Sequence, residues 1–279
     1  MQIIMAMALL AAGITDGVVL KPVANMYSRP SEEADVVSQA IYASPIGILQ
    51  ERDGWARVRT PDDYTGWMPD SAFKRLAHDE RTYASAGPVA RVISLSANLY
   101  REPNVTTHQP LLTVPFETNL EVTQAVDPAE RWLRIRLPDD RAAWVQRGDI
   151  TLDRQPMSKE EIIALSRQFL GVPYLWGGTS SLGFDCSGFT QMLYRRRGIV
   201  MPRDASVQAK WPGAAPADRN HLEAGDLLFF GDSKVTHTGM YIGDGKFINA
   251  TTHDRPVVQI SNLADPYWTK LFIAARRLK

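Results

Sequence analysis

The sequence predicts an α+β domain over its C-terminal part, preceded by two small all-β barrels. Recurring segments in the first half, each with strand-like alternation, indicate the barrels. Helix-like runs followed by strand-like runs after residue 156 indicate the α+β domain. The chain has 279 residues, which is enough for two or three compact domains.

The first sixteen residues form an apolar segment that can be either a secretory signal or a first strand. The run MQIIMAMALLAAG has no Lys or Arg before it, and it is too short to cross a bilayer. Lys plus Arg and Asp plus Glu are balanced at 31 each, so no basic excess favours nucleic acid. We therefore expect neither nucleic-acid binding nor stable membrane insertion.

Two pairs of segments recur in the same order. ANMYSRP (24–30) returns as ANLYREP (97–103), and GWARVRTPDDYTGW (54–67) returns as RWLRIRLPDDRAAW (131–144). These repeats predict two copies of one small domain, over 17–76 and 88–152. Within WARVRT and WLRIRL, apolar residues alternate with other types, as in half-buried strands, and a PDD turn follows each. The four tryptophans that recur with the repeat are expected in the barrel cores: Trp55, Trp67, Trp132 and Trp144.

The segment 156–279 has helix signals followed by strand signals. SKEEIIALSRQFLG (158–171) predicts a helix, with Ser158 and Glu161 as a capping box. A second helix is expected from Cys186 to the glycine at 198. The other predicted elements are a short helix (201–209), a buried strand (225–231), a hairpin around Gly-Asp-Gly (237–251) and a final strand (271–278).

Cys186 is the only cysteine, and it lies at the expected start of the second helix. A helix N-terminus lowers the pKa of a thiol, which favours a nucleophile, although a lone cysteine can also be buried filler. His237 opens the predicted hairpin, and its turn brings Asn249 alongside. We expect Cys186 as nucleophile, His237 as base and Asn249 as the group that orients the imidazole.

These motifs resemble the NlpC/P60 family of cysteine peptidases over nearly all of 156–279. The matching stretches are YLWGG, FDCSGF, MPRDAS, GDLLFF, HTGMYIGDGKFINAT and the closing ARR. The repeats resemble bacterial SH3 domains. The whole chain is similar to the γ-D-glutamyl-L-diamino acid endopeptidases, of the dipeptidyl-peptidase VI type, that carry two such domains. The resemblance implies a papain-like catalytic domain behind two SH3-like barrels.

The resemblance also implies which residues contact the substrate. The corresponding positions here are Tyr64, Tyr174, Trp176, Asp185, Ser187 and Asp204. Asn249 stands where most relatives have a second histidine. Ser44 stands where relatives have a glutamate that holds the ligand amine, which puts a strict preference for a free amine in doubt.

The function that the resemblance implies is hydrolysis of the γ-D-glutamyl–diamino acid bond in peptidoglycan stem peptides, such as L-Ala-γ-D-Glu-diaminopimelate. No cofactor or metal is expected, the partner is the peptide itself, and the protein is expected to be a monomer. The alternatives are an N-acetylmuramoyl-L-alanine amidase, an acyltransferase or a non-catalytic wall-binding protein. Cytoplasmic recycling is slightly favoured over remodelling in the cell envelope, and diaminopimelate and lysine both remain open.

Overall fold

The computed structural model describes residues 16–77, 79–124, 127 and 129–278. The predicted N-terminal apolar segment lies outside the described residues, except for Asp16. Among the helices that are described, none has the length and apolar character needed to span a membrane.

Residues 17–75, which we call the first β unit, form one antiparallel sheet. Seven strands of the described chain follow the order β3-β2-β6-β5-β4-β1-β7. They are β1 (Gly17–Val19), β2 (Val23–Tyr27), β3 (Val36–Ile41), β4 (Pro45–Arg52), β5 (Trp55–Arg59), β6 (Thr65–Pro69) and β7 (Phe73–Arg75), with the 3-10 turn η1 (Asp70–Ala72) before β7. The predicted alternation is confirmed in β5, which buries Ala56 and Val58. Both side chains belong to the core of this unit.

Residues 89–151, the second β unit, repeat this topology. The strand order in the described residues is β10-β9-β13-β12-β11-β8-β14, which matches the first order strand for strand. The strands are β8 (Val89–Val92), β9 (Ser96–Tyr100), β10 (Leu112–Pro115), β11 (Asn119–Val122), β12 (Trp132–Arg136), β13 (Ala142–Gln146) and β14 (Ile150–Thr151), with η2 (Arg147–Asp149). The two sequence copies therefore share one strand order.

The prediction that the repeated tryptophans fill the two cores is wrong. All four are half-buried and lie outside the core clusters of the described residues. Trp55 packs edge to face on Tyr27, and Trp132 packs in the same way on Tyr100, each at 5.5 Å between ring centroids. Successive side chains of a strand point to opposite faces of the sheet. The small apolar residues face the core, so the tryptophans lie on the other face.

Residues 156–278 contain an antiparallel sheet and four α-helices within the described chain. Six strands follow the order β17-β22-β18-β19-β20-β21. The elements are α1 (Lys159–Ser166), η3 (Arg167–Phe169), β15 (Thr179–Ser180), β16 (Gly183–Phe184), α2 (Cys186–Arg195), α3 (Ala205–Gln208), β17 (Ala214–Ala217), η4 (Arg219–His221), β18 (Leu227–Phe230), β19 (His237–Gly243), β20 (Lys246–Thr251), β21 (Val257–Asn262), α4 (Pro266–Leu271) and β22 (Phe272–Leu278). The capping box of Ser158 and Glu161 is confirmed. The prediction missed β15, β16, β17, β21 and α4.

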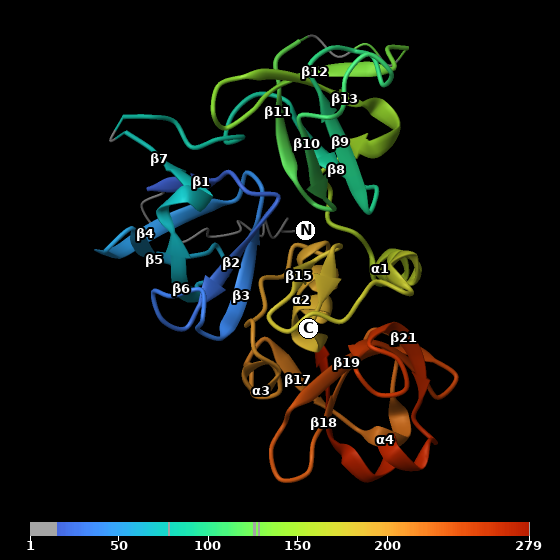
Figure 1. Ribbon diagram of the computed structural model, residues 1–279. Coiled ribbons are helices and arrows are strands. Elements are labelled where there is room, and N and C mark those ends of the chain that lie inside the picture. Colours follow the sequence, from blue (N-terminus) through green and yellow to red (C-terminus); the bar gives the residue numbers. More distant parts are fainter. Residues whose placement is uncertain (1–15, 78, 125–126, 128, 279) are drawn as a thin grey trace, which may run out of the picture.

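Helix α2 lies where the two β units meet the C-terminal sheet (Figure 1). The Gln191 side chain donates to Asp62 of the first β unit at 2.9 Å. Arg195, in the last turn of the helix, donates twice to Glu117 of the second β unit, at 2.9 and 2.6 Å. Both β units therefore hold the helix whose first residue is Cys186.

Candidate active site

Cys186 is the first residue of α2, as the sequence predicts. Asp185 is the N-cap, and its Oδ1 accepts a hydrogen bond from the backbone N–H of Gly188 at 2.7 Å. Cys186 is 7% exposed. The backbone of Thr238, the second residue of β19, hydrogen-bonds to it. The cysteine therefore lies against the strand that begins at His237.

The pKa of the thiol is shifted upward, contrary to the expectation from a helix start. Burial raises the pKa of Cys186 to about 12, and the charge of Asp185 acts in the same direction. Hydrogen bonds from the backbone of Thr238 and Ser187 and the charge of Arg203 oppose this shift. Burial outweighs the helix end because an apolar surrounding disfavours the thiolate. At neutral pH the resting thiol is therefore protonated and needs a base.

His237 and Asn249 form the hydrogen bond that their spacing predicts. The imidazole Nε2 and the Asn249 Oδ1 are 2.9 Å apart. The Asn249 side chain is fully buried, and its Nδ2 donates to the Gln259 carbonyl at 3.2 Å and to Ser261 Oγ at 3.1 Å. These two bonds fix Oδ1 as the acceptor, so Nε2 carries the hydrogen and Nδ1 is the basic nitrogen.

The imidazole of His237 is neutral at physiological pH. Burial lowers its pKa from 6.5 to about 4, against the opposing effects of the Asn249 hydrogen bond and the Asp185 charge. A neutral imidazole can accept a proton from a neutral thiol, whereas an imidazolium cannot. The pair therefore has the protonation states of a nucleophile and its general base.

Two further residues contact the His237–Asn249 pair, and the sequence did not single out either of them for this role. The Trp268 ring, from α4, stacks on His237 with 5.0 Å between centroids and 29° between planes, and it is 3% exposed. Gly239 lies opposite Asn249: a Cβ built there would lie 2.9 Å from Asn249 Cβ and 2.8 Å from Phe247 Cδ2. Only a residue without a side chain lets the two strands approach this closely.

Two predicted substrate contacts, Asp185 and Ser187, are engaged with protein groups. Both oxygens of Asp185 accept from the guanidinium of Arg203, at 2.5 and 3.0 Å. The same guanidinium donates to Ser187 Oγ at 2.9 Å. Arg203 has no separate role in the sequence analysis, although it lies within the matching stretch MPRDAS.

Tyr174 and Trp176 lie on the loop before α2 and differ in exposure. Tyr174 is half-buried, and its N–H donates to the Pro256 carbonyl at 2.7 Å. Burial, with the nearby charges of Cys186 and Asp185, raises the pKa of the Tyr174 hydroxyl, which therefore stays a donor. Trp176 is 70% exposed, so its ring is open to a ligand or to solvent.

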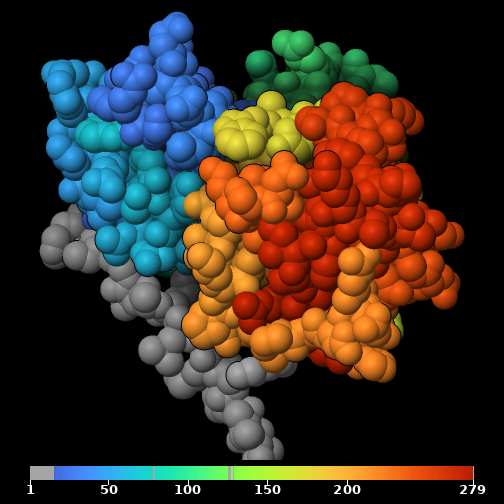
Figure 2. Space-filling view, turned by 90° about the horizontal axis from the view of Figure 1, so that it is seen from below, coloured from blue at the N-terminus to red at the C-terminus, as the bar shows by residue number. Residues whose placement is uncertain are grey.

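Tyr64 and Asp204 come together from different parts of the chain. The Tyr64 hydroxyl of the first β unit donates to Asp204 Oδ1, the N-cap of α3, at 3.3 Å. Burial and the Asp204 charge raise the pKa of Tyr64 to about 12. The space-filling view shows the first β unit directly against the light-orange segment near residue 200 (Figure 2). One wall of the site is therefore supplied by the first β unit.

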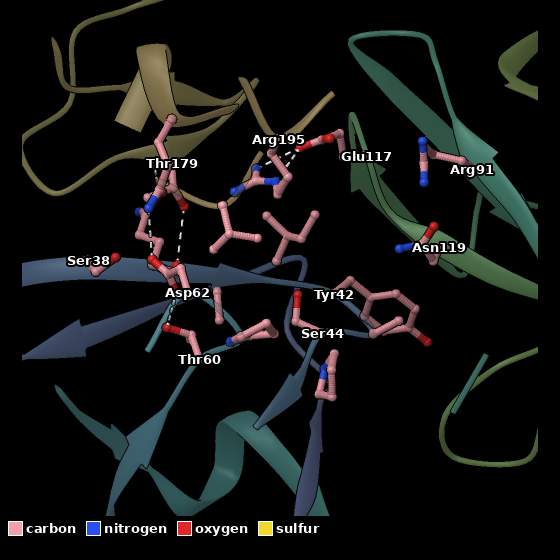
Figure 3. A pocket seen from close by; sticks show the side chains of 18 residues that line it. Ser38, Tyr42, Ser44, Thr60, Asp62, Arg91, Glu117, Asn119, Thr179 and Arg195 are labelled. Atoms are coloured by element: carbon pink, nitrogen blue, oxygen red, sulfur yellow. Dashed lines mark hydrogen bonds and ion pairs between the residues drawn. The ribbon is translucent and has the colours of Figure 1, made fainter. Parts of the chain in front are cut away.

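Ser44 lies in the turn between β3 and β4 of the first β unit. It lines a cavity of about 240 Å³ between the two β units and α2, and the described residues of that lining include neither Tyr64 nor Asp204. The Arg195–Glu117 ion pair lies at one side of the cavity and Asp62 at the other (Figure 3).

Comparisons with known proteins agree with this architecture. The model of the NlpC/P60 family matches residues 171–277, and the model of the bacterial dipeptidyl-peptidase SH3 domain matches residues 26–73. A protein of Bacillus cereus named gamma-D-glutamyl-L-lysine dipeptidyl-peptidase is 32% identical over 258 residues, which is 86% of this chain and 74% of that protein. A protein of the same name from Bacillus subtilis is 28% identical over 87% of this chain and 81% of its own length.

A solved structure shows the same arrangement over almost the entire chain. The crystal structure of an NlpC/P60 family protein from Bacillus cereus superimposes with a TM-score of 0.82 at 26% identity. The superposition covers 95% of this chain and 99% of that one.

Proposed function

Because the chain belongs to the NlpC/P60 family of cysteine peptidases, we propose that it hydrolyses the γ-D-glutamyl–diamino acid bond of peptidoglycan stem peptides. The observation that carries the proposal is the His237–Asn249 hydrogen bond on the strand that packs against the buried Cys186 thiol. The relatives named gamma-D-glutamyl-L-lysine dipeptidyl-peptidase support the choice of bond.

In the first step, Nδ1 of His237 takes the thiol proton while Sγ of Cys186 attacks the γ-carbonyl carbon of D-glutamate. The imidazolium then gives this proton to the leaving amine of the diamino acid, and the C–N bond breaks to leave a thioester. The same nitrogen next deprotonates a water molecule, which attacks the thioester. The C–S bond then breaks, the proton on Nδ1 returns to Sγ, and the product leaves as a carboxylic acid that ionises in water.

Charge that develops on the carbonyl oxygen needs donors within the site. The backbone N–H of Cys186 at the helix start is one candidate, and the hydroxyl of Tyr174, which stays protonated, is the other. Asn249 keeps the imidazole in the tautomer that this sequence of proton transfers requires.

The first β unit limits the length of the substrate on one side. Tyr64 and Asp204 place a hydroxyl and a carboxylate together at this wall, and a carboxylate suits the ammonium group of a free N-terminal L-alanine. Short free muropeptides are therefore the preferred substrates. The other proposed substrate contacts are Trp176, Asp185 and Ser187. Asp185 and Ser187 lie at the N-terminal cap of α2, where they hydrogen-bond to each other.

The second β unit is a second SH3-like domain in this proposal. Its strand order equals that of the first unit, and its sequence repeats the first copy. We place the domain boundaries at 17–76, 88–152 and 156–279.

The test is product analysis by mass spectrometry. The enzyme is incubated with L-Ala-γ-D-Glu-L-Lys, with the diaminopimelate analogue and with an N-acetylated tripeptide, and the Cys186→Ala variant is the control. The proposal predicts that the wild type alone releases L-Ala-D-Glu from the two free tripeptides and cleaves the N-acetylated tripeptide more slowly. Failure to cleave these peptides, transfer of an acyl group to another acceptor, or cleavage of a muramoyl tripeptide only at its muramoyl amide would each reject it.

A further inference from the structure

Arg203 is a buried arginine that forms an ion pair with Asp185, the residue immediately before Cys186. It is 3% exposed, and its Nη1 and Nη2 donate to the two oxygens of Asp185 at 3.0 and 2.5 Å. The same Oδ1 of Asp185 caps α2 through the N–H of Gly188. A bidentate guanidinium fixes both the position and the rotation of a carboxylate. The helix cap in front of Cys186 therefore has one orientation.

The remaining contacts of this guanidinium reach in two further directions. Nη1 also donates to Ser187 Oγ at 2.9 Å, and Nε donates to Ser38 Oγ at 3.1 Å. Ser38 belongs to β3 of the first β unit and is 2% exposed. Arg203 therefore connects the residues on both sides of Cys186 to a different part of the chain.

Arg203 also matters through its charge. Asp185 acts to raise the pKa of the Cys186 thiol, and Arg203 acts to lower it. The Tyr174 hydroxyl and the His237 imidazole are neutral at physiological pH, because burial raises the pKa of Tyr174 and lowers that of His237. The Asp204 carboxylate, next to Arg203 in sequence, accepts a hydrogen bond from the Tyr64 hydroxyl. Asp185 and Arg203 are thus oppositely charged groups that both act on the thiol, and an unpaired Asp185 would oppose formation of the thiolate.

We propose that Arg203 is a positioning residue for Cys186: it holds Asp185 in the capping geometry of α2 and offsets the negative charge of that carboxylate beside the reacting sulfur. The inference rests on the proposed role of Cys186 as the nucleophile. Lysine can supply the charge but not all of these contacts, since the bonds to Asp185, Ser187 and Ser38 use three nitrogens in a planar fork.

The single cysteine gives a direct readout, because alkylation of the intact protein by iodoacetamide reports Cys186 alone. The rate is measured from pH 5 to 10 for the wild type, Arg203→Met, Arg203→Lys and the control Arg277→Met. Arg277 is a matched control because it also forms a bidentate ion pair with a buried carboxylate. Its Nε and Nη2 each donate to an oxygen of Asp226 at 2.8 Å. Circular dichroism and thermal melting check that each variant is folded.

We expect Arg203→Met to shift the alkylation profile to higher pH and to slow the reaction at pH 7 about tenfold or more, since one pKa unit corresponds to about a factor of ten. The alkylation rate of Arg203→Lys at pH 7 should lie between those of Arg203→Met and the wild type. Arg277→Met should keep the wild-type profile. A folded Arg203→Met protein with the wild-type profile would overturn the inference.

Asp185→Asn provides a second test that does not depend on the folding of an Arg203 variant. Asparagine still caps a helix but carries no charge, so alkylation at pH 7 should become faster than in the wild type. The double variant Asp185→Asn/Arg203→Met should recover to within about threefold of the wild type, because the charge that Arg203 offsets is gone. A double variant as slow as Arg203→Met alone would contradict the electrostatic part.

The peptidase assay separates this inference from the proposed function. If the wild type cleaves no stem peptide but the alkylation profile moves as described, the function fails and the role of Arg203 stands. If the wild type cleaves the peptide and Arg203→Met keeps its alkylation profile, the function stands and the role of Arg203 fails.

Discussion

The Asn249 side chain accepts a hydrogen bond from His237 at 2.9 Å while its own amide nitrogen is held by Gln259 and Ser261. An asparagine can orient an imidazole as firmly as a histidine does, provided that its amide cannot rotate. The backbone of β21 and the Ser261 hydroxyl meet this condition here. The site therefore needs no second histidine.

Replacing Asn249 by alanine should lower kcat about 10- to 100-fold, because a hydrogen bond to a group that becomes charged contributes about 1.5–3 kcal/mol. Asn249→His should keep most of the activity, since the new imidazole can also accept a hydrogen bond from Nε2–H of His237. Steady-state kinetics on the tripeptide decide this. Equal losses in both variants would show that Asn249 acts through packing alone.

The activity should persist at acidic pH. Burial lowers the pKa of His237 to about 4, and only the neutral imidazole can accept the thiol proton. In a plot of kcat/KM against pH, the acid limb should therefore lie well below pH 6.5, the ordinary value for histidine. An acid limb at or above pH 6.5 would show that the imidazole is not desolvated in this way.

The same shift predicts how stability depends on pH. The unfolded chain protonates His237 near pH 6.5, whereas the folded protein resists protonation until about pH 4. Between these values the unfolded state binds the extra proton, so stability falls as the pH falls through this window. Urea unfolding of the wild type and His237→Gln at pH 7 and pH 5 tests this. The variant should lose less stability between the two pH values.

Gly239→Ala should impair both folding and catalysis. The added Cβ would lie 2.8 Å from Phe247 and 2.9 Å from Asn249, so the hairpin must open by a fraction of an ångström. Overpacking of this kind costs about 1–3 kcal/mol. The control is Gly148→Ala, where a Cβ meets no atom within 4 Å. Unfolding curves and kcat should change in the first variant only; unchanged kcat in Gly239→Ala would contradict the tight approach.

Trp268→Ala should destabilise the protein by about 3–5 kcal/mol, as expected for a large aromatic side chain removed from a core. It should also expose the His237–Asn249 pair to water, because the indole stacks on the imidazole. Trp268→Phe retains an aromatic ring and should recover most of the activity of the wild type. If Trp268→Phe is as inactive as Trp268→Ala, stacking alone does not account for the role of this residue.

The parts of the site that lie on one local element could be predicted from the sequence. Cys186 follows a capping aspartate at a helix start, and His237 and Asn249 lie on the two paired strands of one hairpin, so spacing along the chain is sufficient. The two repeated units were visible for the same reason, because each copy carries its own strand and turn signals.

The parts that depend on the packing of distant segments could not be predicted. Arg203 meets Ser38 across 165 residues of sequence, and Trp268 comes from a six-residue helix too short to leave a periodic pattern. The predicted direction of the shift in the thiol pKa was wrong. Burial of Cys186 depends on the whole fold, whereas the helix end is a local feature.

The most direct test of the account is to search for the covalent intermediate on Cys186. The enzyme is mixed with L-Ala-γ-D-Glu-L-Lys, quenched rapidly with acid and examined by intact-protein mass spectrometry. The account predicts a mass increase equal to the L-Ala-γ-D-Glu acyl group on the wild type, localised to Cys186 and absent from Cys186→Ala. Hydrolysis of the peptide by Cys186→Ala at the rate of the wild type would contradict it.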